Sequence, residues 1–278
     1  MDIGGTKTAF AVFDGDGNEL FYDLFPTNPE EGAESLVARV YDRAKDAVSG
    51  VTAGVIASPG PLDCKTGKIV FVATMGWSNV PIVELFQDKF GFGFKLLNDC
   101  DAGGLGVWKY CGFSGYENLC YMSISTGIGG GAVVNGTLLS GKGNAANFGH
   151  IPVFGEGLEC GCGNKDCLEL YASGSGMEAR YAAKTGEKIP CAEIAKRANA
   201  GEEIALEIFK TASEKLVFAL SAIVATLDPE IVVLGGSVCK SKELFLPSVQ
   251  KALPALRIEY APDNGKQVLY GALAYGLA

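Results

Sequence analysis

Residues 1–13, Met-Asp-Ile-Gly-Gly-Thr-Lys-Thr-Ala-Phe-Ala-Val-Phe, place a strand end, a Gly-Gly turn and a second strand in direct succession. Asp14–Asn18 then indicates a hairpin turn, and Glu19–Phe25 its partner strand. The same opening recurs where a strand at 119–125 meets a Gly-rich turn at 126–131. Two such openings predict an internally duplicated α/β fold, with two lobes around a central cleft.

The spacing of apolar residues predicts the elements around these hairpins. The expected helices are Pro29–Val48, Ile82–Phe90, Asp101–Cys111, Glu202–Leu227 and Tyr270–Leu277, and the expected inner strands are Val51–Ala57, Gly93–Leu97 and Ile231–Leu234. We expect an N-terminal α/β lobe at 1–110, completed by a C-terminal helix in 265–278. A C-terminal α/β lobe is expected at 111–264, with a metal-binding loop at 147–169.

Composition narrows the class of partner. The chain has 278 residues, enough for two lobes with separate cores, and a formal net charge of −9. It contains no block of Lys and Arg, so binding to nucleic acid or to an anionic membrane is not expected. Its apolar runs are too short for a membrane span, and its nine cysteines are odd in number and scattered. We therefore expect a cytoplasmic protein that acts on a small molecule. The chain starts almost at its first turn, so either the first strand is short or residues before Met1 are missing.

The only histidine lies close to three of the cysteines. His150 follows Gly149, and Cys160, Cys162 and Cys167 follow within seventeen residues. Three thiolates and one imidazole complete a tetrahedral zinc shell, which leaves no coordination position for a catalytic water. The pattern therefore predicts a structural zinc site. The alternative is that these cysteines are ordinary buried thiols and that His150 is a hydrogen-bonded loop residue.

Glycines at three predicted strand ends indicate a nucleotide site. Backbone N–H groups of a Gly turn can approach phosphate oxygens closely, because no Cβ intervenes. The candidate residues are Asp2, Gly4, Gly5, Thr6 and Lys7 in the first turn, Thr126, Gly127 and Gly129 in the second, and Gly235 and Gly236 after a third strand. The alternative is that each Gly pair only makes a tight turn. Three such sites favour nucleotide binding over turns alone.

Asn98 and Asp99 end a buried-type strand, where open α/β sheets place their reactive groups. Asp99 could take the proton from a hydroxyl that attacks a γ-phosphate, while Asn98 orients the same substrate. The alternative is that Asp99 is the N-cap of the helix predicted to follow. Together with the Gly turns, the first interpretation is favoured.

The whole chain resembles the ROK (repressor, open reading frame, kinase) sugar kinases of the actin-like ATPase superfamily. The resemblance rests on Asp2-Ile-Gly-Gly-Thr-Lys, Ser58-Pro-Gly60-Pro-Leu-Asp63, Gly76-Trp77, Asn98-Asp99, Thr126-Gly-Ile-Gly-Gly-Gly, Gly149-His150, the three cysteines, Glu169 and Gly235-Gly236. It implies two ribonuclease-H-like lobes that close on a sugar and Mg-ATP. It further implies that Asp99 is the general base and that Asp2 lies near Mg²⁺. Gly60, Asn98, Asn147, His150 and Glu169 would contact the sugar, with His150 also a zinc ligand.

Two departures from the family pattern fall on the sugar side. Asn147 stands where the family has Glu in Glu-x-Gly-His, and Thr74 stands where many members have Asn. An amide in place of a carboxylate removes charge-assisted hydrogen bonds to sugar hydroxyls, at a cost of about 1.5–3 kcal/mol. ATP as donor is therefore a firmer expectation than glucose as acceptor.

We expect a glucokinase-like carbohydrate kinase that transfers the γ-phosphate of ATP to a hydroxyl of a hexose or N-acetylhexosamine, typically the one at C6. One alternative is a sugar-binding regulator, which in this family carries a DNA-binding arm before the first phosphate motif. Another is a ROK-like protein with relaxed catalysis, against which the intact Asp99 argues. Family members are often dimers or tetramers, so a homodimer or homotetramer is expected.

Overall fold

The computed structural model describes residues 1–262 and 265–278. The chain divides into two compact units. Unit 1 contains Met1–Ser114, Leu138–Ala145 and the described residues from 265 onward, and unit 2 contains Gly115–Thr137 and the described residues from 146 to 262. The expected lobe limits at 110 and 111 lie near the first division, but Leu138–Ala145 packs with unit 1. The expected limit at 264 lies outside the described residues.

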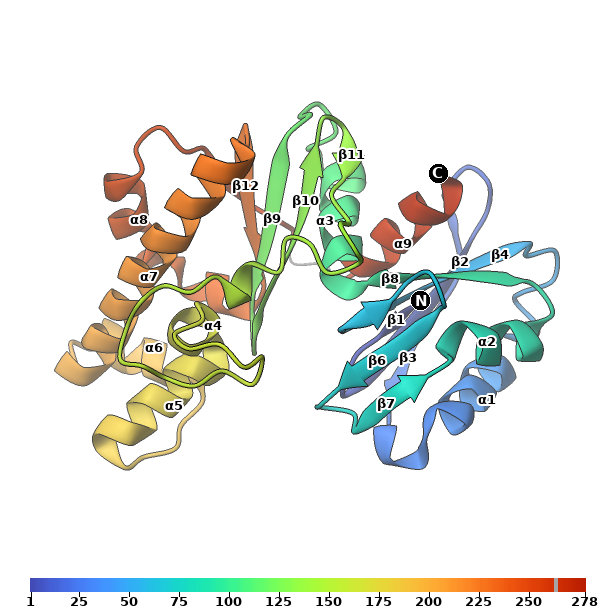
Figure 1. Cartoon of the computed structure of the whole chain (residues 1–278), viewed down its shortest axis with the longest axis horizontal. Coiled ribbons are helices and arrows are strands. Elements are labelled where there is room, and N and C mark those ends of the chain that lie inside the picture. Colours follow the sequence, from blue (N-terminus) through green and yellow to red (C-terminus); the bar gives the residue numbers. More distant parts are fainter. Residues whose placement is uncertain (263–264) are drawn as a thin grey trace. The chain divides into compact units, whose positions relative to one another are not determined.

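Unit 1 is built on a mixed five-stranded sheet in the order β3-β2-β1-β4-β8 (Figure 1). Its strands are β1 (Asp2–Ile3), β2 (Lys7–Phe13), β3 (Glu19–Pro26), β4 (Ala53–Ser58) and β8 (Gly93–Asn98). β1 is antiparallel to β2 and parallel to β4, which is parallel to β8. The first hairpin and both inner strands are therefore confirmed.

Helices cover both faces of this sheet. One face is covered by α1 (Ala33–Ala44), which follows the short 3-10 helix η1 (Pro29–Glu31), and by α2 (Ile82–Phe90); the other is covered by α3 (Asp99–Tyr110) and α9 (Gln267–Leu277) (Figure 1). Apolar residues at helical spacing in α1 pack against Ile56, Phe86 and Leu96 in the core. A separate three-stranded sheet, which the sequence did not predict, consists of β5 (Leu62–Asp63), β6 (Lys68–Val72) and β7 (Trp77–Val80).

Unit 2 repeats the same sheet, in the order β11-β10-β9-β12-β13. Its strands are β9 (Leu119–Ile124), β10 (Ile128–Val134), β11 (Thr137–Leu138), β12 (Ile231–Gly235) and β13 (Ile258–Tyr260). β9 is antiparallel to β10 and parallel to β12, as β1 is to β2 and β4. The matching order and directions confirm the duplication predicted from the two hairpins.

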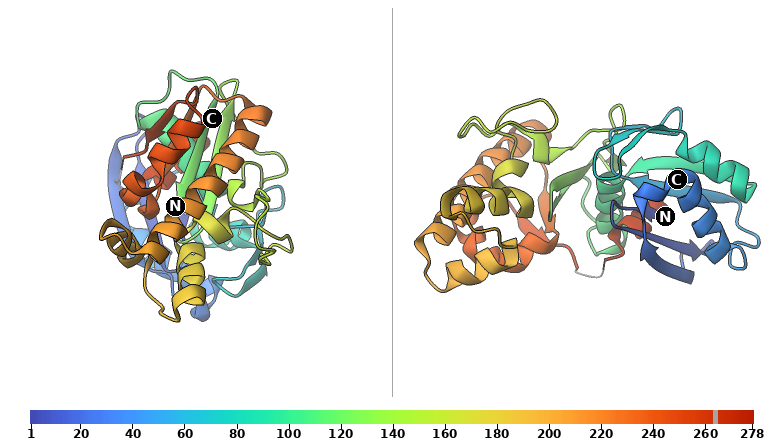
Figure 2. Two further views of the ribbon diagram at one scale, coloured as in Figure 1. Left: turned by 90° about the vertical axis from the view of Figure 1, so that its left-hand side faces the viewer. Right: turned by 90° about the horizontal axis from the view of Figure 1, so that it is seen from below.

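The helices of unit 2 lie on one side of its sheet (Figure 1; Figure 2, left). They are η2 (Phe148–His150), α4 (Glu169–Ala172), α5 (Gly174–Thr185), α6 (Cys191–Asn199), α7 (Glu203–Leu227), η3 (Ser237–Leu244) and α8 (Leu246–Ala252). The long α7 ends at Leu227, the predicted last residue, and Asp228 is its C-cap directly before Pro229.

The second Gly turn is shorter than the sequence predicted. Gly129, Gly130 and Gly131 lie inside β10, where they pair with Ser123, Met122 and Tyr121 of β9. The turn itself spans Ser125 to Gly127, and it is closed by a hydrogen bond from Ser125 N–H to Gly127 O at 2.9 Å.

A solvent-open groove of about 460 Å³ lies beside the short strand β1 in unit 1. Its walls are the apolar side chains of β2, β4, α1, α2 and α9, together with Met1. The Met1 ammonium group donates to Val55 O at 2.8 Å, and burial lowers its pKa to about 6. The groove is therefore largely apolar, and Asp14 is a second ionisable residue of its lining.

Along the described residues, we find no helix with the length and apolar character needed to cross a membrane.

Candidate functional site

A small group of carboxylates in unit 1 lies at the C-terminal ends of its parallel strands. Asp2 of β1 is level with Ala57 of β4, and Ser58 of β4 is level with Asn98 at the end of β8. Asp99 follows directly and is the first residue of α3. The strand register therefore brings Asp2 and Asp99 to the same edge of the sheet, where parallel α/β folds hold their ligands.

Asn98, and not Asp99, is the N-cap of α3. Its Oδ1 accepts hydrogen bonds from Cys100 N–H at 2.9 Å and from Asp101 N–H at 3.3 Å. The helix begins at Asp99, two residues earlier than predicted, because Asn98 provides this cap. The alternative in which Asp99 serves as the N-cap is thus wrong.

Burial raises the pKa of each carboxyl in this group. The pKa of Asp99 is raised by burial, against opposing hydrogen bonds that include one from Cys100 N–H to Asp99 Oδ1 at 2.8 Å. Burial, followed by repulsion from Asp99, raises the pKa of Asp2 to about 7, although the nearby ammonium group opposes this shift. The edge of the sheet therefore holds carboxylates with unusually high proton affinity, which is a common property of functional sites.

Asp101 is a third carboxyl in this region, and sequence reasoning did not single it out. Only 1% of its surface is exposed, and Oδ1 has no hydrogen-bond partner among the described residues. Burial, followed by repulsion from Asp99, raises its pKa to about 8. The position of Asp101 at the start of a small-residue helix gave no sequence signal for this degree of burial.

The first Gly turn is held by a hydrogen bond within the turn and by Thr27, the residue directly after β3. Gly4 N–H donates to Lys7 O at 3.0 Å, and Thr27 Oγ1 donates to Gly4 O at 2.6 Å. Thr6 and Lys7 are exposed. A Cβ atom on Gly5 would lie 3.2 Å from Thr74 Oγ1, so Thr74 lies against this turn.

Gly60 lies in a loop that meets the segment Leu138–Ala145 of the same unit. A Cβ atom on Gly60 would lie 3.3 Å from Asn144 Oδ1, and one on Gly143 would lie 3.2 Å from Cys64 Sγ. Asn144 is therefore a polar neighbour of Gly60 that sequence reasoning missed. The available signal was the Gly-Lys-Gly-Asn sequence at 141–144, which is typical of a close-packed loop.

In unit 2, the predicted nucleotide residues lie around the second Gly turn. Ser125 Oγ is 3.1 Å from Ser237 Oγ, which connects the turn containing Thr126 and Gly127 to the segment after Gly236. The two glycines of that segment also have a packing role. A Cβ atom on Gly235 would lie 2.7 Å from Tyr121 Oη, and one on Gly236 would lie 2.3 Å from Ile124 O.

The predicted sugar-side residues of unit 2 meet the same turn. Glu169 Oε2 accepts a hydrogen bond from Ile128 N–H at 2.9 Å. Asn147 is exposed and precedes η2, and a Cβ atom on Gly149 would lie 2.0 Å from Ile128 O. The segment that contains Asn147 and His150 therefore packs directly on the first residue of β10.

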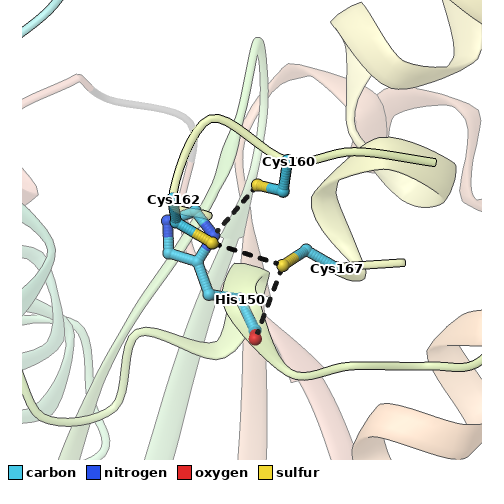
Figure 3. Close-up of side chains that lie close together, drawn as sticks. All are labelled: His150, Cys160, Cys162 and Cys167. Carbon is cyan, nitrogen blue, oxygen red and sulfur yellow. Dashed lines mark hydrogen bonds between the residues drawn. The ribbon is translucent and has the colours of Figure 1, made fainter. Parts of the chain in front are cut away.

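The side chains of His150, Cys160, Cys162 and Cys167 converge in one cluster (Figure 3). Their four ligand atoms lie within 4.8 Å of one another. His150 Nδ1 is 3.7 Å from Cys160 Sγ, and Cys162 Sγ is 3.6 Å from Cys167 Sγ. A zinc–sulfur bond of about 2.3 Å gives a tetrahedron with edges of about 3.8 Å, so these spacings fit a four-coordinate metal ion.

Comparisons with known proteins place this arrangement in a family. The ROK family model matches residues 1–270. An N-acetyl-D-glucosamine kinase of Pectobacterium atrosepticum is 31% identical over 88% of this chain and 85% of its own length. A ROK hexokinase from Thermus thermophilus superposes with a TM-score of 0.88 at 30% identity, covering 99% of this chain and 96% of that one. A ROK glucokinase from Streptomyces griseus, solved with glucose and AMPPNP, has a TM-score of 0.79 at 28% identity, with coverage of 99% and 97%.

The chain thus has the actin-like ATPase fold, as the sequence predicted. Within that fold class, it belongs to the ROK family.

Proposed function

We propose that this protein is an ATP-dependent sugar kinase, which transfers the γ-phosphate of ATP to a hydroxyl of a hexose or N-acetylhexosamine, typically at C6. The observation that carries the proposal is the half-buried Asp99, which directly follows an inner parallel strand and lies near Asp2. The relatives add support, since they include an N-acetyl-D-glucosamine kinase and a glucokinase solved with AMPPNP.

Asp99 is the proposed general base. Burial raises its pKa, which increases its proton affinity relative to an exposed carboxylate. Cys100 N–H donates a hydrogen bond to Asp99 Oδ1, so Asp99 Oδ2 is the oxygen proposed to accept the proton of the attacking hydroxyl. The hydroxyl oxygen then forms a bond to the γ-phosphorus as the bond to the β-phosphate oxygen breaks. The Gly turns at Gly4–Lys7 and Ser125–Gly127 are proposed to bind phosphate oxygens through backbone N–H groups.

Asp2 is the proposed carboxylate ligand of Mg²⁺. Its carboxyl lies near that of Asp99, and burial together with repulsion from Asp99 raises the pKa of Asp2 to about 7, so a divalent cation would offset the repulsion between the two carboxylates. Carboxylate oxygen is also the donor type that Mg²⁺ prefers. When bound, Mg²⁺ would neutralise charge on the phosphates.

Zinc is the proposed ion of the cluster in Figure 3, with His150, Cys160, Cys162 and Cys167 as its four ligands. Four protein ligands close the tetrahedral shell, so the role proposed for the ion is structural. His150 binds through Nδ1 in this arrangement, which leaves Nε2 to contact the sugar, as proposed from the family pattern.

The identity of the sugar is proposed to depend on Asn147, with Gly60, Asn98 and Glu169 as further contacts. Since Asn147 is exposed and neutral, its substitution Asn147→Glu would restore the carboxylate that the family pattern places there. We expect the variant to lower KM for glucose or N-acetylmannosamine by about tenfold or more, because hydrogen bonds to a charged group are stronger. An unchanged or higher KM for both sugars would show that Asn147 serves a different acceptor.

An ADP-release assay over a panel of hexoses and N-acetylhexosamines, with zinc and magnesium present, tests the proposed activity. We expect sugar-dependent release of ADP for at least one acceptor, and a sugar phosphate detectable by mass spectrometry. ADP release no faster than without sugar, across the whole panel, would overturn the proposal.

A further inference from the structure

The turn Ser125–Gly127 and the start of β10 are held between two segments that both carry ligands of the metal cluster. One segment contains His150. Gly149, just before it, has no room for a Cβ atom against Ile128 O, and a Cβ atom on Gly130 would lie 2.3 Å from the Phe148 ring. The backbone before His150 thus packs directly against β10.

The other segment follows Cys167. Glu169, two residues later, accepts a hydrogen bond from Ile128 N–H, and a Cβ atom on Gly127 would lie 2.5 Å from Glu169 Oε2. Further along, Gly174 N–H donates to Ser125 O at 2.8 Å, and the Ser175 hydroxyl donates to Thr126 O at 2.7 Å. Three consecutive peptide units of the turn are therefore bonded to the segment that begins at Cys167.

We propose that Glu169 is a positioning residue, through which a metal ion in the cluster sets the shape of the second Gly turn and thereby couples metal binding to nucleotide binding. The inference rests on the proposed function, because it takes the turn to bind phosphate. A metal ion would fix the distance between the His150 segment, which packs on the start of β10, and the Cys167 segment, which is bonded to the turn. The turn then presents its N–H groups in one arrangement, so less ordering is required when phosphate binds.

Coupling of this kind is reciprocal. If the metal ion raises affinity for the nucleotide, the nucleotide raises affinity for the metal by the same factor. Metal affinity can be measured on protein that is not turning over, so it tests the proposal without an activity assay.

The experiment measures zinc affinity by competition with a chromophoric chelator, with and without AMPPNP. We expect AMPPNP to increase zinc affinity by about 5- to 150-fold in the unmodified protein. Glu169→Ala should abolish the increase, because Ile128 N–H loses its acceptor. Glu169→Gln should retain most of it, because the amide oxygen can accept the same hydrogen bond. Glu214→Ala, at an exposed position on α7, is the control and should leave the increase unchanged.

Hydrogen exchange at the Ile128 amide gives a second readout. We expect removal of zinc to speed exchange at this amide in the unmodified protein, and Glu169→Ala to speed it even with zinc bound. Equal zinc affinity with and without AMPPNP, in protein that binds AMPPNP, would overturn the coupling. Failure of the zinc-loaded protein to bind AMPPNP would instead overturn the proposed function, and unchanged exchange at Ile128 on zinc removal would overturn the positioning role by itself.

Discussion

The central strands of the two sheets differ in length, although the sheets share one strand order. In unit 2, β9 pairs with β10 at six positions and with β12 at five. In unit 1, β1 pairs with β2 at two positions and with β4 at one. The groove beside β1 lies where unit 2 has the first residues of β9. The two sheets thus share one order and one set of strand directions, although their central strands pair over different lengths.

The two sheets also differ in chemistry at equivalent strand ends. β8 is followed by Asp99, whereas β13, which occupies the same place in unit 2, is followed by Ala261 and Pro262. Unit 2 instead has a metal cluster beside its Gly turn. The duplicated scaffold therefore carries carboxylates in one copy and, in the other, a Cys/His cluster that could hold a metal ion.

The largest expected effect concerns the strand end that has no acidic counterpart in unit 2. Asp99→Asn should lower kcat by about 10²- to 10⁴-fold, because the amide cannot accept the proton. The melting temperature should change little, since Asn98 and not Asp99 caps α3. The ADP-release assay and a thermal melt measure the two effects, and activity equal to that of the unmodified protein would remove Asp99 from the mechanism.

A second prediction is that pH changes the stability of the protein mainly through unit 1. Because the pKa of Asp101 is raised to about 8 in the folded protein, the fold favours the protonated carboxyl. This contribution to stability is complete below about pH 4, where the unfolded chain is also protonated at Asp101, and it is lost as the pH rises towards 8. Asp101→Asn should therefore be more stable than the unmodified protein at pH 8 by about 2–4 kcal/mol, and similar at pH 4. Trp77 and Trp108 both lie in unit 1, so urea unfolding followed by tryptophan fluorescence reports on this unit. Parallel pH profiles for the two proteins would contradict the assignment.

Glycine-to-alanine changes compare how tightly the two hairpins are packed. A Cβ atom on Gly130 would lie 2.6 Å from Ala146 O, a backbone atom, whereas one on Gly5 would meet only the Thr74 side chain, at 3.2 Å. Gly130→Ala should lower the free energy of unfolding by about 1–3 kcal/mol, and Gly5→Ala by less than about 1 kcal/mol. Denaturant unfolding measures both, and equal losses would show that the hairpins are packed alike.

The smallest expected effect is that of an extension of β1, which tests whether the groove can accept additional strand residues. By continuation of the β1 register, three residues added before Met1 would lie level with Ala11–Phe13 and Ala53–Val55. An engineered Val-Ile-Val extension should therefore raise stability by about 1–2 kcal/mol, after the cost of ordering the added residues. A Gly-Ser-Gly extension of equal length is the control. If both extensions have the same effect on urea unfolding, the groove does not accept a strand.

The sequence was sufficient to predict those elements and clusters for which several local signals agree. The helix predicted at Ile82–Phe90 has those bounds in the structure, because Pro81 precedes it and Gly91, with a φ of 79°, ends it. The metal cluster was predicted from the spacing of three cysteines, and the structure brings them together with His150. The roles of these residues in binding and catalysis stay predictions.

Long-range contacts could not be read from the sequence. The hydrogen bond from Ile128 to Glu169 joins residues 41 positions apart, and neither has a sequence feature that specifies the other. The strands β5 to β7 are short and interrupted by turns, so they lack a clear period of two. Asp101 is buried on α3, which packs against α9, and no pattern within α3 predicts this burial or this packing.

The groove beside β1 has a practical consequence for studies of unfolding. Fluorescence of the dye ANS is commonly taken as a sign of a molten globule, because the dye binds exposed apolar surface. Here, a solvent-open apolar groove of about 460 Å³ is part of the folded protein. A protein that begins at Met1 should therefore enhance ANS emission in its native state, and its dye signal has to be paired with near-ultraviolet circular dichroism before loss of tertiary packing is inferred.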